Sequence, residues 1–256
     1  MRRALRIVHR NALVYRHVWR GSLFASFAQP VGFLLAMGIG LGRLVDRGGA
    51  ALPGGVSYLQ FLGPGLLAAA CMQTAAFEST WPVHAKIADR RNYDAIDATP
   101  MTLWDVVAGE LAWMAVRLLS VAAVFMLALA LFGIIHSPRA LLAIPAAVLN
   151  GLAFSAPLIA VAVASRRPND FNVVFRFILT PLFLFSGVFF PVSQLPPFLQ
   201  RVAAFTPLFH GVELVRGILL NTLDGRAAIV HAGYLTVLAA AGAVAGWVAL
   251  DRRLHP

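Results

Sequence analysis

The chain has 256 residues, of which 59% are apolar and only 12% are charged, and its mean hydropathy is +0.76. Soluble domains are about 45–50% apolar and about 25% charged, so these values exclude a soluble domain. They also exclude a disordered chain, which would be poor in apolar residues. We therefore expect an all-α membrane protein whose residues 1–256 form a single transmembrane domain.

The charge balance is strongly basic, with 21 Lys and Arg against 11 Asp and Glu and a net charge of +10. A basic chain either binds nucleic acid or, in a membrane protein, places its positive charge in cytoplasmic loops. The positions of the arginines decide between these alternatives. Cys71 is the only cysteine, which excludes an intrachain disulfide and any multi-cysteine metal site.

The N-terminal segment, residues 1–21, carries six arginines, and its apolar side chains recur at spacings of three and four. This spacing places the apolar side chains on one face of a helix. A basic helix with an apolar, aromatic-ended stripe is typical of a helix that lies in the membrane interface. The stripe consists of Leu5, Val8, Ala12, Tyr15 and Trp19.

Six apolar segments are long enough to cross a bilayer, which takes about 20 helical residues. Two of the segments that connect them, residues 81–105 and 191–227, are long and semi-polar. We therefore predict six transmembrane helices. Their approximate bounds are 22–42, 57–80, 107–132, 140–164, 173–190 and 228–250.

Basic residues are distributed unevenly between the two sides of this arrangement. With the N-terminus in the cytoplasm, thirteen basic residues fall inside, in 1–21, 81–105, 165–172 and 251–256. The outside loops 43–56 and 133–139 then hold three, with the long segment 191–227 left out. Because Lys and Arg collect in cytoplasmic loops, both termini are predicted to be cytoplasmic. This accounts for the charge, and we do not expect nucleic acid as a partner.

Three charged residues lie in or beside the predicted spans. Glu110 and Arg117 are seven residues apart, two turns along one helical face, and Glu78 ends the preceding span. Charges are costly in lipid, so these side chains are expected to face protein. We leave two interpretations open: an internal ion pair that stabilises the bundle, or a role in gating or in the substrate path. That Glu78 faces the other two across the bundle is a hypothesis.

Motifs of catalysis are missing from the sequence. It contains no HExxH, no GxSxG and no P-loop, and no two histidines have the i,i+3 or i,i+4 spacing of helical metal ligands. We therefore predict no catalytic residue, no metal site and no ATP site in this chain.

The segment that follows the second span predicts a short helix outside the membrane. Tyr93, Ile96 and Asp97 share one helical face, and Thr99-Pro100 ends the helix because the residue before proline avoids helical geometry. Downstream, Thr102 is a plausible N-cap with Asp105 at the capping-box distance. The short helix is either solvated or docks on a cytoplasmic partner.

Residues 185–217 are too apolar for a free loop and too interrupted by proline to span a membrane. Two short amphipathic helices that enter the outer leaflet fit this segment best, although simple packing on the outer face remains an alternative. Within it, Arg216 can pair with Glu213 one helical turn away. The apolar positions with helical spacing are Leu195, Phe198, Leu199, Val202 and Phe205.

Two of these segments resemble the permease subunit of ABC-2 type transporters. Tyr93-Asp94-Ala95-Ile96-Asp97-Ala98-Thr99-Pro100 is similar to that family's coupling helix. The run that contains Phe190-Pro191, Leu195-Pro196, Pro207 and His210 and reaches Arg216 is similar to the family's signature before the last span. Within the family, the order of features, together with Phe77-Glu78 and Val107-Ala108-Gly109-Glu110, resembles the nodulation protein J and daunorubicin-resistance permease branch.

The resemblance implies how such a chain works. It implies a bacterial inner-membrane permease that acts as a dimer with separate ABC ATPase subunits, which use ATP and Mg. It also implies export of an amphipathic drug, lipid or lipo-oligosaccharide. The alternative is an integral membrane enzyme or scaffold that acts on lipids. The residues implied in ATPase coupling are Tyr93, Asp94, Ile96, Asp97, Thr99 and Pro100, and those of the outer re-entrant hairpin, which would close the exit, are Phe190, Pro191, Leu195, Pro196, Pro207, His210, Glu213 and Arg216.

Overall fold

The computed structural model describes residues 7–16, 21, 31–42, 55–88, 102–135 and 137–254, and every regular element in these ranges is a helix. Residues 7–16 form a helix that we call the N-terminal helix. The other elements are η1 (Leu34–Leu41), α3 (Tyr58–Ala88), α5 (Leu103–Leu131), η3 (Pro138–Leu142), α6 (Ala143–Ala164), α7 (Asp170–Val174), η4 (Phe175–Leu179), α8 (Thr180–Phe185), η5 (Val192–Gln194), α9 (Pro197–Ala204), α10 (Pro207–Leu219) and α11 (Gly225–Leu254).

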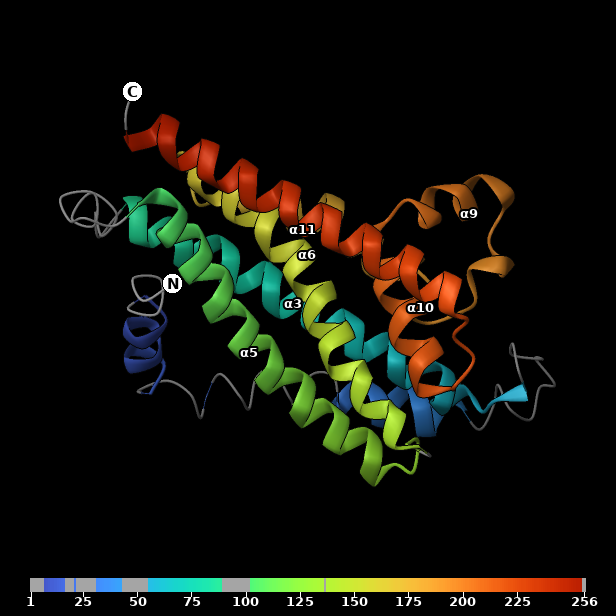
Figure 1. Ribbon diagram of the computed structural model, residues 1–256. Coiled ribbons are helices and arrows are strands. Elements are labelled where there is room, and N and C mark those ends of the chain that lie inside the picture. The colour runs from blue at the N-terminus through green and yellow to red at the C-terminus, as the bar shows by residue number, and fades with distance from the viewer. Residues whose placement is uncertain are drawn as a thin grey trace.

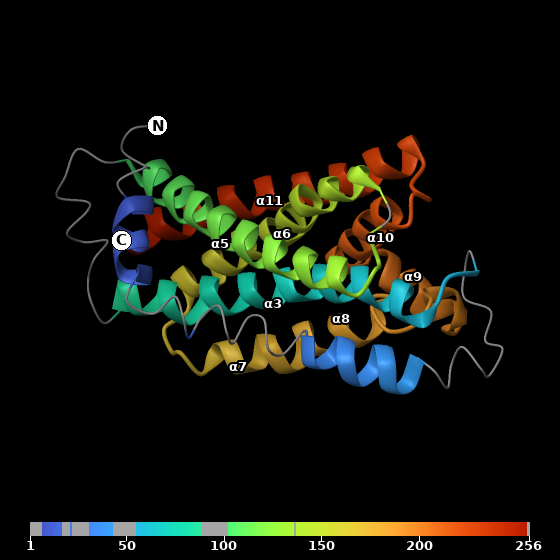
Figure 2. The ribbon, with the colours of Figure 1, turned by 90° about the horizontal axis from the view of Figure 1, so that it is seen from below.

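Four long helices lie lengthwise in a bundle, with α6 in contact with α3, α5 and α11 (Figure 1). The N-terminal helix and the end of α11 lie at one end of the bundle, and α9 and α10 lie at the opposite end (Figures 1 and 2). The helical stretch α7–η4–α8 runs beside α3, next to η1 (Figure 2). The bundle therefore has two ends formed by different elements.

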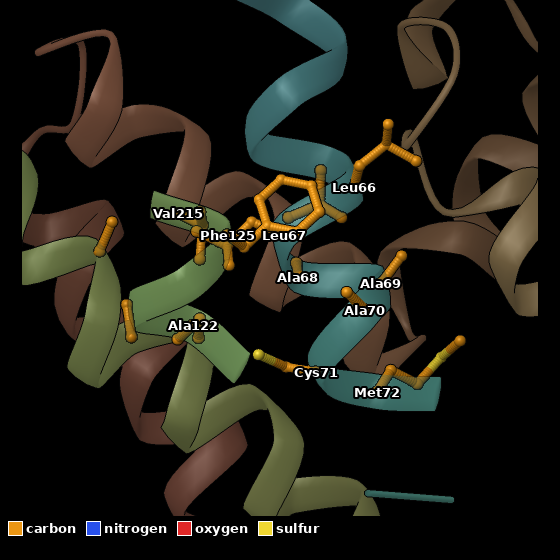
Figure 3. Close-up of a cluster of buried hydrophobic side chains, with 14 of the residues drawn as sticks. Leu66, Leu67, Ala68, Ala69, Ala70, Cys71, Met72, Ala122, Phe125 and Val215 are labelled. Carbon is orange, nitrogen blue, oxygen red and sulfur yellow. The ribbon is translucent and has the colours of Figure 1, made fainter. Parts of the chain in front are cut away.

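Small side chains allow the helices to approach closely. In the middle of α3, the run from Ala68 to Cys71 is buried beside Ala122 and Phe125 of α5 (Figure 3). On α11, a Cβ added at Gly242 would overlap the backbone nitrogen of Pro157 in α6. Close packing of this kind drives helix association inside a membrane, where lipid gives no hydrophobic advantage to burial.

The outer surface of α11 is apolar. Within α11 the buried residues are Leu235, Gly242, Gly246 and Leu250, a single stripe against α6. Large apolar side chains cover the remaining surface, and Ile229 and Val237 are 76% and 69% exposed. An apolar face of this extent suits lipid and not water.

Among the described residues, three helices are long and apolar enough to cross a membrane: Leu103–Leu131, Pro138–Ala164 and Gly225–Leu254. A fourth is reached if α9 and α10, which meet at 83°, count as one broken span. The all-helical membrane class is therefore confirmed, whereas six transmembrane helices stay a prediction. The predicted interface helix is represented by residues 7–16, and the first predicted span by residues 31–42.

Two helices differ in length from the predicted spans. The span predicted to end at residue 80 continues as α3 to Ala88, because Val83 and Ile87 are buried one turn apart at the end of the bundle. The span predicted to end at residue 190 ends as a helix at Phe185, because Gly187 has φ +81, which a right-handed helix does not accommodate.

The predicted capping box of Thr102 and Asp105 is confirmed. The backbone N–H of Asp105 donates to the Thr102 hydroxyl (3.2 Å), and the Asp105 carboxylate accepts from the Thr102 N–H (3.1 Å). This reciprocal capping box begins α5 at Leu103, four residues before the predicted bound.

Candidate functional site

Two ion pairs join α3 to α5 at the end of the bundle that holds the N-terminal helix. Arg117 Nη2 lies 2.6 Å from Glu78 Oε1, and Lys86 Nζ lies 2.6 Å from Glu110 Oε2. The two helices are antiparallel. The paired residues are eight positions apart on α3 and seven positions apart on α5. The pairs are therefore stacked about two turns apart along one helix–helix seam.

The N-terminal helix contacts both pairs from a single face. Asn11 Nδ2 donates to Glu110 Oε2 (3.2 Å), and Arg117 Nη1 donates to the Tyr15 hydroxyl (2.7 Å). The Arg117 guanidinium also lies over the Tyr15 ring, 4.2 Å from its centroid. Asn11 and Tyr15 are four residues apart and so share one helical face. We call Asn11, Tyr15, Glu78, Lys86, Glu110 and Arg117 the ion-pair cluster.

Among the described residues, the ion-pair cluster contains two acids and two bases and is largely shielded from solvent. Arg117 is 1% exposed and Glu110 is 5% exposed, and the two acids match the two bases. Arg117 binds Glu78 in a fork, with Nε and Nη2 each within hydrogen-bond distance of Oε1. Buried ions are costly unless they are paired, so separating the three elements would leave charges uncompensated. The cluster therefore favours joint movement of the N-terminal helix, α3 and α5.

At the other end of the bundle, Arg216 of α10 connects three segments. Its Nη2 donates to the Gly187 carbonyl (2.7 Å), its Nε to the Phe61 carbonyl of α3 (3.2 Å), and its Nη1 to Glu213 Oε1 (3.1 Å). The guanidinium also lies 3.8 Å from the centroid of the Phe61 ring. Gly65 leaves the room for this arrangement, since an added Cβ would lie 2.9 Å from the Val188 carbonyl oxygen.

Side chains of α11 hold the same region from another direction. His231 and His210 of α10 share a hydrogen bond between their Nδ1 atoms (2.8 Å). The Tyr234 hydroxyl donates to the carbonyl of Phe205, directly after α9 (2.6 Å), and the Tyr234 ring stacks on His210 with centroids 4.0 Å apart. We call α9 and α10 together the outer hairpin. It is fixed to α3 through Arg216 and to α11 through His231 and Tyr234.

In the part of the chain that the structure describes, no group of three or more His, Cys, Asp or Glu side chains is placed to hold a metal ion. The polar contacts described at both ends of the bundle join helices to one another. The sequence of the chain matches known membrane transport proteins.

Residues 4–220 match the family model described as ABC-2 type transporter. The chain belongs to the ABC-2 type transporter family. It is similar to nodulation protein J of Sinorhizobium fredii, with 34% identity over 90% of this chain and 86% of the relative. It is also similar to nodulation protein J of Bradyrhizobium diazoefficiens, with 34% identity over 96% of this chain and 91% of the relative.

A more distant similarity is to the inner membrane transport permease YadH of Escherichia coli, with 26% identity over 62% of each chain. No solved structure matches this ABC-2 chain. Family membership and the apolar helices together make the chain an integral membrane protein and a transport permease, as the sequence motifs predicted.

The charged residues predicted inside this ABC-2 bundle are buried or half-buried, but their pairing could not be read from the sequence. Glu110 and Arg117 share a face of α5, and each forms an ion pair with a residue of α3. Lys86 was missed as a partner because it was assigned to a polar connecting segment. The available signal was that it is the only lysine in the chain. Asn11 and Tyr15 were missed as partners because nothing local in the sequence marks them.

The residues predicted for the outer hairpin have different positions in the ABC-2 structure. His210, Glu213 and Arg216 gather in the contacts that hold α10. Pro191, Pro196 and Pro207 stand at the start of η5, α9 and α10, while Phe190 and Leu195 lie in the connecting turns. The six predicted coupling residues, Tyr93, Asp94, Ile96, Asp97, Thr99 and Pro100, lie outside the described residues.

Proposed function

We propose that this chain is the membrane-spanning subunit of an ATP-driven exporter in the inner membrane of a bacterium. A separate ABC ATPase supplies the energy from ATP and Mg, and this chain supplies the path for an amphipathic drug, lipid or lipo-oligosaccharide. Both termini face the cytoplasm. Membership of the ABC-2 type transporter family supports this proposal.

The ion-pair cluster is the observation that carries the proposal. The segment that precedes α5, which contains the proposed coupling residues from Tyr93 to Pro100, connects α3 directly to α5. A force applied to that segment reaches these two helices first. The cluster ties the N-terminal helix to the same two helices through Glu78–Arg117 and Lys86–Glu110. An ATPase that contacts the segment would therefore move three elements as one unit.

The outer hairpin is proposed to close the exit at the far end. α9 presents Phe198, 73% exposed, and is followed by Phe205, 77% exposed. Such large apolar side chains are suited to acyl chains of the outer leaflet. The hairpin is held by a few polar contacts at Arg216 and His210, which can be broken one at a time when it moves.

A second copy of the permease is proposed to complete the path. The stretch from α7 to α8 leaves an aromatic-rich surface that is largely apolar, with Arg176 also exposed on it, and Phe177 is 70% exposed. Two such surfaces facing each other would give an amphipathic substrate an apolar lining. The exposed large residues on this stretch are Val173, Phe177, Ile178, Leu184 and Phe185.

The first experiment tests the partner and the coupling segment. The permease is purified together with its cognate ATPase, and the triple variant Asp94→Ala/Ile96→Ala/Asp97→Ala is compared with the matched control Arg139→Ala, an exposed residue at the opposite end. We expect the triple variant to lose the ATPase and the control to retain it. Equal recovery of the ATPase would reject the coupling assignment.

The second experiment tests the ion-pair cluster. ATP-dependent transport is measured in proteoliposomes that contain equal amounts of wild-type permease or Arg117→Ala. We expect the variant to bind the ATPase and to transport at least tenfold more slowly, because the N-terminal helix no longer follows α3 and α5. Unchanged transport at equal abundance would reject a role for the cluster in coupling.

A further inference from the structure

An open hollow of about 660 Å³ lies where α6 ends and the chain turns into α7. Val161 and Ala164, in the last turn of α6, contribute apolar surface to it. Its polar surface comes from Arg166, Arg167 and other residues of the turn, and it shares no residue with the ion-pair cluster. The residues that line it are Val161, Ala164, Ser165, Arg166, Arg167 and Asp170.

Among the described residues, the positive charge of this hollow has no acidic partner. Both arginines are exposed, and within the described residues neither guanidinium forms an ion pair or a hydrogen bond. Asp170 lines the same hollow but does not pair with either arginine. Two adjacent guanidinium groups without an internal partner favour an anion from outside, and arginine is well suited to phosphate oxygens.

A third arginine offsets the partial negative charge at the end of α6, which would otherwise repel an anion here. The last carbonyl groups of a helix carry partial negative charge and have no partner within the helix. At the end of α6, Arg253 of α11 donates to the carbonyl oxygens of Val163 and Ser165 (2.9 Å to Ser165). The carbonyl end of α6 is thus neutralised, and the charges of Arg166 and Arg167 remain available.

Aromatic residues place this end of the bundle at a membrane surface. Trp104 at the start of α5 stacks on Trp247 of α11, with centroids 5.5 Å apart and ring planes 6° apart. Tryptophan is enriched at the boundary between bilayer and water. Trp247 stands six residues before Arg253, about 9 Å along the helix. The arginines therefore lie just beyond the tryptophan level, at the depth of lipid headgroups.

We propose that the hollow between α6 and α7 binds the phosphate headgroup of an anionic phospholipid. Arg166 and Arg167 face the phosphate, and Val161 and Ala164 face the glycerol and the first acyl carbons. Basic pockets beside transmembrane helices on the cytoplasmic side are known to recognise such headgroups. The apolar part of the hollow distinguishes a lipid from free phosphate, which has no apolar part to place there. The inference depends on membrane insertion and not on the proposed transport.

The test uses the purified full-length chain in nanodiscs of phosphatidylcholine with increasing phosphatidylglycerol, and native mass spectrometry counts the retained phosphatidylglycerol. The double variant Arg166→Gln/Arg167→Gln is compared with Arg139→Gln/Arg226→Gln, which removes the same charge from exposed residues at the other end. Each arginine near an anionic surface contributes about a fivefold preference, so we expect an affinity loss of about 25-fold for the first variant. The control should match wild type.

Asp170→Asn serves as a second variant with the opposite expected sign. It removes the negative charge that lines the hollow, so phosphatidylglycerol should bind up to about fivefold more tightly. This result supports the proposal even if the double arginine variant fails to fold. Unchanged binding in both the Asp170 and the Arg166/Arg167 variants would overturn the proposal.

Two further outcomes would identify a different ligand. Competition by glycerol 3-phosphate at the concentration that phosphatidylglycerol requires would show a soluble anion site and overturn the lipid assignment. Loss of the cognate ATPase from Arg166→Gln/Arg167→Gln in lipid-free detergent, with no phosphatidylglycerol bound to wild type, would show that the arginines contact protein.

Discussion

At the scale of single residues, we expect substitution of Arg117 to lower the stability of the bundle most, because all three of its guanidinium nitrogens form hydrogen bonds inside it. Arg117→Gln leaves the Glu78 carboxylate without its ion-pair partner. Removing one member of a buried pair costs about 3–5 kcal/mol, whereas neutralising both members costs much less. We predict that Glu78→Gln/Arg117→Gln is more stable than Arg117→Gln in a detergent unfolding titration. Equal stability of the two variants would contradict this view of the pair.

A second prediction concerns two glycines. Gly211 of α10 packs on Asn150 of α6, whose Nδ2 donates to the Ala68 carbonyl (2.8 Å), and an added Cβ would overlap the Asn150 Oδ1. Overpacking costs about 1–3 kcal/mol, so Gly211→Ala should lower the free energy of unfolding. The control Gly233→Ala faces open space in α11 and should raise it, by about 0.5–1 kcal/mol.

The Asn150 Oδ1 is a buried acceptor without a hydrogen-bond partner among the described residues. The three nearest atoms to a Cβ added at Gly211 all belong to this side chain: Oδ1, Cγ and Cβ. Asn150→Ala removes Oδ1 and Cγ and leaves only Cβ, at 2.9 Å, so Gly211→Ala should cost less when combined with it. An undiminished cost in the double variant would place the clash elsewhere.

At the scale of elements, the outer hairpin depends on its contacts with α11. His210 and His231 face each other through Nδ1, so one ring donates the hydrogen and the other accepts it. His210→Phe keeps an aromatic ring against Tyr234 but loses this bond. We predict faster hydrogen exchange across α9 and α10 in this variant and in His231→Phe.

A double-mutant cycle isolates the histidine pair. The variant His210→Phe/His231→Phe should be less destabilised than the sum of the two single variants, with a coupling energy of about 1 kcal/mol. The matched control is Thr236→Ala, which removes a bond within α11 and should leave exchange in the hairpin unchanged. Additive effects of the two histidine variants would show that they do not interact.

Elements were predictable from sequence where their determinants are local. Thr102 and Asp105 are three residues apart. The apolar spacing from Leu195 to Phe205 coincides with the short helix α9. Contacts between distant residues were not predictable. Asn11 contacts Glu110, which lies 99 residues away in the sequence, and no local pattern encodes which helix faces pack together. The end of α8 depends on the positive φ of Gly187. The apolar pattern of the sequence does not distinguish this glycine from the other residues of the predicted span.

At the scale of the whole molecule, the two ends of the bundle differ in charge. The end that holds the N-terminal helix carries six described arginines, Arg10, Arg16, Arg166, Arg167, Arg252 and Arg253, whereas the end that holds the outer hairpin carries four, Arg139, Arg201, Arg216 and Arg226. The positive-inside rule applies to short loops near helix ends. On this rule we predict that the N-terminal helix and the α6–α7 turn face the cytoplasm and that the α10–α11 loop faces the outside.

The last prediction tests this orientation with the only cysteine. Cys71 is fully buried, so Cys71→Ala gives a background without thiols, to which Asn169→Cys or Thr222→Cys is added; both positions are exposed. A membrane-impermeant maleimide applied to intact cells should label Thr222→Cys at once, because the α10–α11 loop faces outward. It should label Asn169→Cys only after the membrane is opened, since the α6–α7 turn is inside. The reverse pattern would invert the molecule and place the hollow of Arg166 and Arg167 in the outer leaflet.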